Sequence, residues 1–215
     1  MIQVKNVTKK YGSIKALNDV SFDVEDGEFI SIVGPSGSGK TTLLNVVAGL
    51  LTPTSGEVAV NGESIYKLSQ RERTAFRRRE LGFVFQTFNL IPYLTAIENV
   101  EIPMYLSGIS HEEQERMAKK LLERVWLGDR LTHRPSELST GEQQRVAIAR
   151  ALANKGSVIL ADEPTGNIDM KTGRELMKYM RRLNKEDGVT MLVVTHNPEV
   201  AKFADRKMEI INGKI

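Results

Sequence analysis

The chain of 215 residues is 40% hydrophobic and 27% charged, an ordinary composition for a globular protein with one main core. It contains no cysteine, which excludes a disulfide scaffold and a thiolate metal site and fits a reducing compartment. The net charge of +3 is too small to argue for a nucleic-acid partner, and none is expected. The longest apolar stretch, at residues 43–51, is far shorter than the ~20 residues of a membrane span, and the N-terminus lacks a signal-peptide pattern. We therefore expect a cytoplasmic protein that would need a partner for any work at a membrane.

The first part of the chain predicts antiparallel strands. Residues 2–7 and 20–24 alternate apolar and polar side chains, which is typical of strands with one buried face. Residues 28–33 predict a strand that runs into a glycine-rich loop, and a helix is expected from Lys40. Residues 56–60 and the Asn-Gly pair after them predict a further hairpin.

The second part of the chain predicts helices first and then strands. Residues 95–150 are expected to be mostly helical, with breaks at Pro92, Pro103 and Pro135. Two short apolar strands at residues 158–161 and 190–195 flank a helix predicted over residues 171–184. Buried strands that alternate with helices indicate a parallel sheet covered on both faces. The expected fold class is α/β, with a mixed, mainly parallel sheet, an N-terminal antiparallel β subdomain and a helical subdomain.

Residues 34–41 carry the complete Walker A pattern of a P-loop NTPase, between a predicted strand and a predicted helix. Glycines let successive backbone N–H groups point at phosphate oxygens, and the helix N-terminus adds its positive dipole. We expect Lys40 to bridge the β- and γ-phosphates of ATP, Thr41 to bind Mg²⁺ and Thr42 to contact the α-phosphate. The candidate nucleotide-binding residues of this loop are Gly34, Pro35, Ser36, Gly37, Ser38, Gly39, Lys40, Thr41 and Thr42.

An apolar strand at residues 158–161 ends in two carboxylates, Asp162 and Glu163, which is the Walker B arrangement. Asp162 is expected in the coordination shell of Mg²⁺, and Glu163 is expected to orient or deprotonate the attacking water. A solvated turn after a strand would also explain the pair, and Pro164 suits such a turn. Together with a Walker A loop, the pair favours ATP hydrolysis.

Residues 138–145 read Leu-Ser-Thr-Gly-Glu-Gln-Gln-Arg, which resembles the signature motif of ABC transporter ATP-binding subunits. The resemblance covers nearly the whole chain. It implies Gln86 as the Q-loop glutamine, Asp169 in the D-loop and His196 as the switch histidine, and it places Tyr11 on the adenine ring. Catalytic roles are implied for Lys40, Gln86, Glu163 and His196. Magnesium ligation is implied for Thr41, Gln86 and Asp162. The implied signature contacts to nucleotide come from Ser139, Thr140, Gly141 and Glu142.

The resemblance also implies how the chain is organised. One ABC ATPase domain would span residues 1–215, with the core and the antiparallel β subdomain at about 1–87 and 156–215 and the helical subdomain at about 88–155. Each ATP would lie between the Walker A loop of one copy and the signature of a second copy. Because ADP lacks the γ-phosphate, the closed homodimer would form with ATP alone and open after hydrolysis.

Two signature residues depart from the common family pattern. Thr140 stands where glycine is usual, and Glu142 stands where glutamine is frequent. If the site needed positive φ at Thr140, a β-branched residue would be strained there, and altered closure would follow. Ser139 and Glu142 also fit a capping box at the start of a helix, a role that is compatible with phosphate binding.

Residues 88–100 and 162–167 resemble the lipoprotein-release, macrolide-efflux and cell-division branch of the family. That branch implies a separate membrane permease, received after Gln86, with export or extraction as its work and a position on the inner face of the cell membrane. A non-transport ABC ATPase of the repair or translation type stays open, although such proteins usually carry a long coiled coil or two ATPase domains. A kinase or GTPase acting alone would leave the signature unexplained. The arginines of residues 71–79 predict a solvated helix face, with lipid or partner contact as the alternative.

Overall fold

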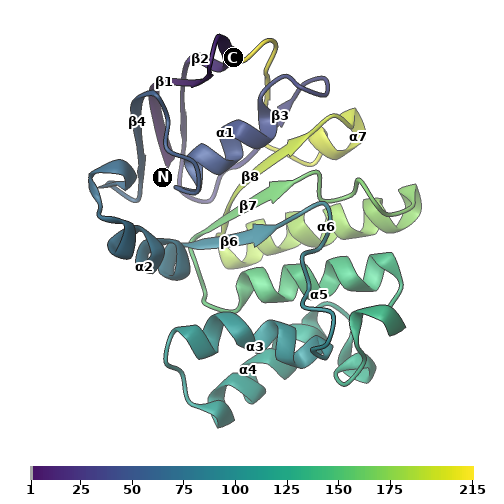
Figure 1. Ribbon diagram of the computed structural model, residues 1–215. Helices are drawn as coiled ribbons and strands as arrows, with labels where there is room; N and C mark the ends of the chain where they lie inside the picture. The colour runs from purple at the N-terminus through teal and green to yellow at the C-terminus, as the bar shows by residue number, and fades with distance from the viewer. Residues whose placement is uncertain (1) are drawn as a thin grey trace.

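The computed structural model describes residues 2–215 and contains two sheets with helices on both faces of the larger one (Figure 1). The smaller sheet is antiparallel, with strand order β2-β1-β4-β5. Its alternating apolar residues, such as Ile2 and Val4, are buried, which is why this segment forms strands with one face on a core. The strands are β1 (Ile2–Tyr11), β2 (Ile14–Val24), β4 (Ser55–Val60) and β5 (Glu63–Ser64).

The larger sheet has five strands in the order β6-β7-β8-β3-β9, and all its neighbouring pairs are parallel. The predicted α/β class is confirmed, with the antiparallel strands in a sheet of their own. The sequence did not reveal the two edge strands, because one has four residues and includes Gly82, and the other is largely charged. The strands are β3 (Phe29–Val33), β6 (Leu81–Val84), β7 (Val158–Asp162), β8 (Thr190–Thr195) and β9 (Arg206–Glu209).

Helices cover the parallel sheet unequally on its two faces. One helix lies between the two sheets, α1 (Lys40–Val47). The opposite face is covered by α5 (Thr140–Leu152) and α6 (Met170–Asp187). The remaining helices are α2 (Gln70–Glu80), α3 (Ala96–Leu106), α4 (His111–Arg124) and α7 (Pro198–Ala201), with short 3₁₀ turns at Ile65–Lys67, Gly128–Arg130 and Pro135–Glu137. No helix within residues 2–215 is long and apolar enough to cross a bilayer.

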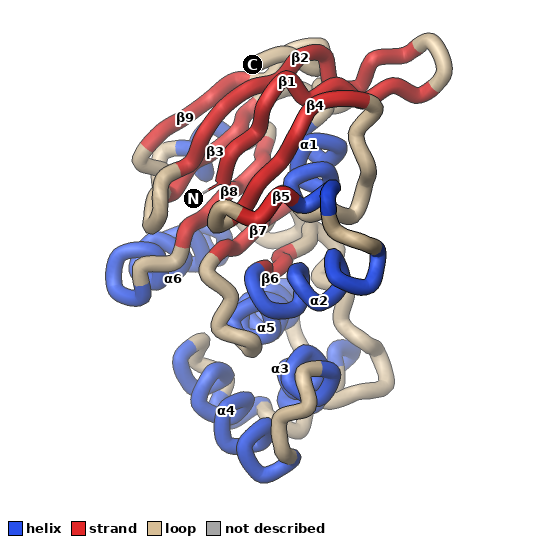
Figure 2. The backbone as a smooth tube through the Cα atoms, turned by 90° about the vertical axis from the view of Figure 1, so that its left-hand side faces the viewer, coloured by secondary structure: helices blue, strands red, loops and turns tan. Residues whose placement is uncertain are grey.

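The parallel strands separate two hydrophobic cores, because successive side chains point to opposite faces. Ile30 and Leu160 face α1 and the antiparallel sheet. Phe29, Ile159 and Met191 face the helices on the other side, where α3, α4 and α5 form the helical subdomain. Figures 1 and 2 agree in placing α3 and α4 at the end of the molecule opposite the antiparallel sheet.

One predicted helix break is wrong. Pro103 lies inside α3, which continues to Leu106. Pro103 lacks the N–H that would bond the Asn99 carbonyl, but only three residues of α3 follow it, so the disruption is confined to the last turn. Its carbonyl oxygen is also well bonded, because it accepts from Ser107 Oγ at 2.9 Å and from Asn154 Nδ2 at 3.2 Å.

Asp205 ties the C-terminal segment to the core. Its Oδ1 accepts hydrogen bonds from Arg181 at 2.6 Å and Lys185 at 3.3 Å, and its Oδ2 accepts from the Phe29 backbone N–H at 3.1 Å. The bond with Arg181, opposed by burial and assisted by the Phe29 N–H and Lys185, holds the pKa of Asp205 well below its ordinary value. A depressed carboxylate pKa means that the charged form favours the folded state.

We expect Asp205→Asn to lower the free energy of unfolding by about 1 kcal/mol at pH 7, since the groups are partly exposed. The difference from wild type should shrink as the pH falls below the ordinary aspartate value of 3.8, because the unfolded wild-type chain then takes up a proton that the folded chain still excludes. Urea denaturation of both proteins at a series of pH values from 7 downward measures this difference in the free energy of unfolding. Glu199→Gln, which removes an exposed ion pair with Lys202, is the control and should change little. An Asp205→Asn difference that is constant with pH would contradict the assignment.

Candidate functional site

The phosphate loop connects β3 to α1, and its geometry requires glycine. Gly37 and Gly39 have φ values of 78° and 106°, in the left-handed region, and a Cβ on Gly39 would clash with the Ala16 carbonyl oxygen. Because Gly39 is the N-cap of α1, no side chain caps this helix. The first N–H groups of α1 are therefore left for an anion, and Ser38 Oγ is buried without a partner in the same loop.

Lys40 is buried, and its ammonium group lies over the loop. It donates to the carbonyl oxygens of Gly34 and Pro35 at 2.7 and 2.9 Å. The loop thus combines a fixed positive charge, a helix dipole and free backbone donors, which together suit a polyphosphate.

The Walker B carboxylate lies beside the loop. Thr41 Oγ1 is 3.3 Å from Asp162 Oδ1, so the structure brings together two of the three predicted magnesium ligands. Burial raises the pKa of Asp162, and the Thr41 hydrogen bond opposes the shift. Hydroxyl, carboxylate and amide oxygens are the donors that Mg²⁺ prefers, so Thr41, Asp162 and Gln86 fit it. Within residues 2–215 no group of three or more His, Asp or Glu side chains could hold a metal alone, so phosphate and water oxygens would complete the shell.

Glu163 is held at the end of β8 by a set of short hydrogen bonds. Its Oε2 accepts from Thr195 Oγ1, and its Oε1 accepts from the His196 backbone N–H, both at 2.8 Å. His196 Nδ1 also lies 2.8 Å from Oε1. Glu163 has a φ of 45°, which turns its side chain back toward β8. The two predicted catalytic residues are therefore neighbours. Thr195 was missed by sequence reasoning, although its place just before His196 could have indicated it.

The Q-loop and D-loop are in contact with each other. Gln86 follows β6 and is exposed, and its backbone oxygen accepts from Asn167 Nδ2 at 2.8 Å. A Cβ on Gly166 would lie 2.8 Å from Gln86 Nε2, so glycine here lets the Gln86 side chain take its present position. Asp169 caps α6, with Oδ1 accepting from the backbone N–H groups of Lys171 and Thr172 at 3.0 Å.

Tyr11 ends β1 with half of its surface exposed (50%), and the Lys9 ammonium lies 5.2 Å from its ring centre. Its hairpin approaches the phosphate loop, because the Ala16 oxygen lies against Gly39. An exposed ring near the loop is consistent with the predicted adenine platform.

The signature starts α5. Ser139 is the N-cap, and the predicted capping box is confirmed: Ser139 Oγ accepts from the Glu142 N–H at 3.3 Å, and Glu142 Oε2 accepts from the Ser139 N–H at 2.8 Å. These bonds from Ser139 lower the pKa of Glu142. Thr140 is the first helical residue and has no positive φ, so the strain considered for a β-branched residue does not arise.

The two halves of the predicted site lie on opposite faces of the parallel sheet. α1 belongs to the core shared with the antiparallel sheet, whereas α5 belongs to the core of the helical subdomain (Figure 1). In the part of the chain that the structure describes, no hydrogen bond or ion pair joins Ser139 or Glu142 to the phosphate loop. One copy therefore does not bring its own signature to its own Walker A loop.

Comparison with known proteins decides the family. Residues 17–166, more than half of the chain, match the protein-family model described as ABC transporter. The chain belongs to the ABC transporter family. It is 43% identical over 219 residues to the lipoprotein-releasing system ATP-binding protein LolD of Geobacter metallireducens, covering all of this chain and 97% of LolD. It is 46% identical over 219 residues to the macrolide export ATP-binding/permease protein MacB of Brucella melitensis, covering all of this chain and 34% of MacB.

A solved structure of another ABC cassette matches the whole chain. It is the dimeric, post-hydrolysis state of MJ0796 of Methanocaldococcus jannaschii with ADP and Pi, at a TM-score of 0.92 and 47% identity, covering 100% of this chain and 96% of that one. The chain is thus the ATP-binding subunit of an ABC transporter and hydrolyses ATP. The predicted family, fold and enzymatic activity are confirmed.

In this ABC ATPase, the far end of the signature helix holds the segment after the Q-loop. Arg150 donates to the carbonyl oxygens of Asn89 at 2.5 Å and Phe88 at 2.7 Å. Both Phe88 and Asn89 have left-handed φ values, of 60° and 49°. No ion pair of Arg150 is recorded among the described residues, and burial lowers its pKa. Its donors therefore serve to fix the backbone after Gln86, a role that sequence reasoning missed.

We expect Arg150→Met to destabilise the fold by about 1–3 kcal/mol, because the partly buried Phe88 carbonyl and the exposed Asn89 carbonyl lose a charged donor. Backbone hydrogen exchange at residues 86–91 should rise more than elsewhere in the chain. Arg145→Met, on the same helix and with its guanidinium over Trp126, is the matched control. Equal exchange of residues 86–91 in both variants would contradict this role of Arg150.

Proposed function

We propose that two copies of this chain close around ATP and that closure drives a separate membrane permease in export or extraction. The observation that supports this most is the separation of Lys40 and Ser139 on opposite faces of one sheet. The dimeric MJ0796 cassette with ADP and Pi is the arrangement that a second copy would complete. In this proposal the chain is a single ATPase domain with its helical subdomain at about residues 88–155, and it acts at the cytoplasmic face of the membrane.

The residues of one copy divide the work of hydrolysis. Lys40 and the first N–H groups of α1 bind the phosphates, and Tyr11 stacks on the base. A bound Mg²⁺, held by Thr41, Asp162 and Gln86, would neutralise phosphate charge. Glu163 accepts a proton from the attacking water, and the Thr195 hydroxyl and His196 N–H fix its carboxylate in place.

The second copy supplies the other half of the site. Its Ser139 hydroxyl, the start of α5 and that helix's dipole would face the γ-phosphate. The γ-phosphate gives the closed state its extra affinity, so its loss opens the dimer. Each hydrolysis cycle thus becomes one closing and opening movement for the permease to follow.

We expect Glu163→Gln to bind ATP and run as a dimer in gel filtration, because hydrolysis no longer removes the γ-phosphate, and to run as a monomer with ADP. Adding Ser139→Arg to the same chain should preserve ATP binding, measured by equilibrium titration, and return the protein to a monomer. The added side chain would block the surface that meets the phosphate.

The control for this pair is Ser110→Arg, at the N-cap of α4, combined with Glu163→Gln. This control should still dimerise with ATP. A dimer that survives Ser139→Arg, or a Glu163→Gln protein that stays monomeric with saturating ATP, would overturn the shared site.

A hollow beside the Q-loop is where we propose that a permease helix docks. It has a volume of about 410 Å³ and lies between α2, the end of β6 and α3. Its apolar lining includes the stacked rings of Phe83 and Phe85, 5.4 Å apart, and Leu106, which is 53% exposed. Arg150 and Asn89 also line it, so an occupant would touch the segment that follows Gln86. The similarity to LolD and MacB favours a permease as this occupant.

We expect Leu106→Asp to abolish co-purification of the chain with its permease from membranes, since a carboxylate would enter an apolar contact. The thermal unfolding midpoint should stay the same, because the side chain is already exposed. Leu50→Asp, at another exposed lining residue (52%), should act in the same way, whereas Ile14→Asp, exposed on β2, should not. Undiminished co-purification of both rim variants would place the permease elsewhere.

The alternative of a non-transport ABC ATPase gains no support. The longest helix in residues 2–215 is α6, with 18 residues, too short for the long coiled coil of that class.

A further inference from the structure

A second hollow lies at the edge of the sheet opposite the ATP site. Its volume is about 460 Å³, within the range of small-molecule sites. α4 forms one wall, and the loops that lead into β7 and β8 form the other. The N-terminal ends of these strands lie about 13 Å from Asp162 in β7 and about 16 Å from Thr195 in β8. Its occupant would therefore not compete with ATP for the phosphate loop.

The floor of this hollow is apolar. It is formed by Met117, Leu121, Leu152 and Val189, which belong to the margin of the helical core. An anion without apolar groups would bury no apolar surface on this floor, whereas a short hydrocarbon chain would be removed from water there.

The rim of the hollow is cationic. Four of its lining residues carry positive charge and one, Asp187, carries negative charge. Arg116 is neutralised by Glu113 at 2.6 Å, and Arg124 by Asp187 at 2.6 Å. The two remaining cations are Lys120 and Lys155, and within residues 2–215 neither forms a hydrogen bond or a close ion pair through its side chain. Both lysines are exposed, and the interacting carboxylate is that of Glu113, whose pKa is lowered mainly by Arg116 and further by Lys155.

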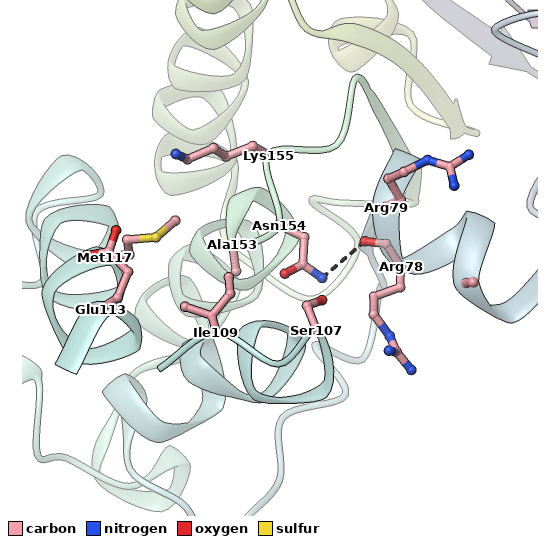
Figure 3. A pocket seen from close by; sticks show the side chains of 10 residues that line it. Arg78, Arg79, Ser107, Ile109, Glu113, Met117, Ala153, Asn154 and Lys155 are labelled. Atoms are coloured by element: carbon pink, nitrogen blue, oxygen red, sulfur yellow. Dashed lines mark hydrogen bonds between the residues drawn. The ribbon is translucent and has the colours of Figure 1, made fainter. Parts of the chain in front are cut away.

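Lys155 stands where two hollows meet. It and Met117 also line a neighbouring hollow of about 510 Å³. Figure 3 shows the Lys155 side chain extending away from Arg79, toward the side of α4 that carries Met117. Lys155 has a φ of 54°, a left-handed conformation that glycine would adopt at lower cost.

We propose that this hollow binds a small amphipathic anion, with a phosphate or carboxylate head between Lys120 and Lys155 and a short apolar chain on the floor. Such a ligand would contact α4 on one side and the start of β7 on the other, and so join the helical subdomain to the sheet. It would add to the Arg124–Asp187 ion pair, which joins α4 to the end of α6 at the same place.

Isothermal titration with hexyl phosphate, in saturating MgADP to occupy the phosphate loop, tests this site. Wild-type protein should bind one hexyl phosphate per chain. Lys120→Gln/Lys155→Gln should weaken binding at least about tenfold, since two charged hydrogen-bonding groups are removed. Inorganic phosphate should bind at least about tenfold more weakly than hexyl phosphate, because it lacks the apolar chain.

The matched control is Lys119→Gln/Lys178→Gln, which removes the same charge from α4 and α6 outside the lining. It should bind hexyl phosphate as wild type does, and both double variants should keep the wild-type unfolding temperature. Equal weakening in the two double variants would mean only a general charge effect and would overturn the site. Equal affinities for phosphate and hexyl phosphate would overturn the amphipathic ligand, and absence of binding to wild type would overturn the proposal as a whole.

Discussion

The parallel register of β3, β7 and β8 is the constraint on which the ATP site depends. Val33 pairs with Thr195, and Asp162 pairs with Val194, so the three strands end within one residue of each other. The phosphate loop follows the first strand, the carboxylates end the second, and the Thr195-His196 pair ends the third. The backbone hydrogen bonds of the sheet therefore set the relative backbone positions of Lys40, Glu163 and His196, whatever rotamers their side chains adopt. A one-residue slip of β7 would turn Asp162 to the other face of the sheet.

The same sheet explains why one copy is insufficient. Alternation along each strand creates two cores, and each core takes one functional helix. α1 packs in the core that the antiparallel sheet covers, and its N-terminus has no side-chain cap, which suits phosphate binding. α5 enters the other core with its N-terminus capped by Ser139 and Glu142. Since a central sheet separates the two helix starts, a nucleotide that needs both must take one from another molecule.

Much of the architecture could be predicted because the signals were local. Alternation indicated the antiparallel strands, apolar runs indicated β7 and β8, and the glycine-rich loop located α1. The strands β6 and β9 gave no such signal, because β6 has only four residues and includes Gly82, and β9 depends on pairing with β3 rather than on its own apolar residues. Pro103 was misjudged as a break because its distance from the helix end is not visible in the sequence.

The residues of the candidate site also differ in how far the sequence alone could identify them. The Walker residues follow from phosphate chemistry, whereas Tyr11, Gln86, Asp169 and His196 were indicated only by family resemblance, and their roles remain predictions. Thr195 and Arg150 were missed because each acts on a residue distant in the sequence, at separations of 32 and 62 positions, and only the position of Thr195 beside His196 hinted at its role. Four of the five arginines of α2 make contacts that the sequence did not reveal. Arg73, Arg77 and Arg78 donate to backbone carbonyls, and Arg79 pairs with Glu63 and Glu80, so these side chains stabilise local structure.

The helical subdomain is attached to the core by polar ties at two distant places. Arg150 holds the backbone after Gln86, and Arg124 pairs with Asp187 at the opposite edge. Between Ser139 and Arg150 the signature helix is a rigid rod of about 16 Å, so a shift of the Q-loop segment at one end moves the phosphate-binding end as well. An occupant of the hollow beside Phe85 would displace the segment held by Arg150. A ligand between Lys120 and Lys155 would act beside the Arg124–Asp187 ion pair. The position of the signature would then depend on the occupants of two hollows that share no lining residue, because each hollow lies beside a contact that restrains a different side of the helical subdomain.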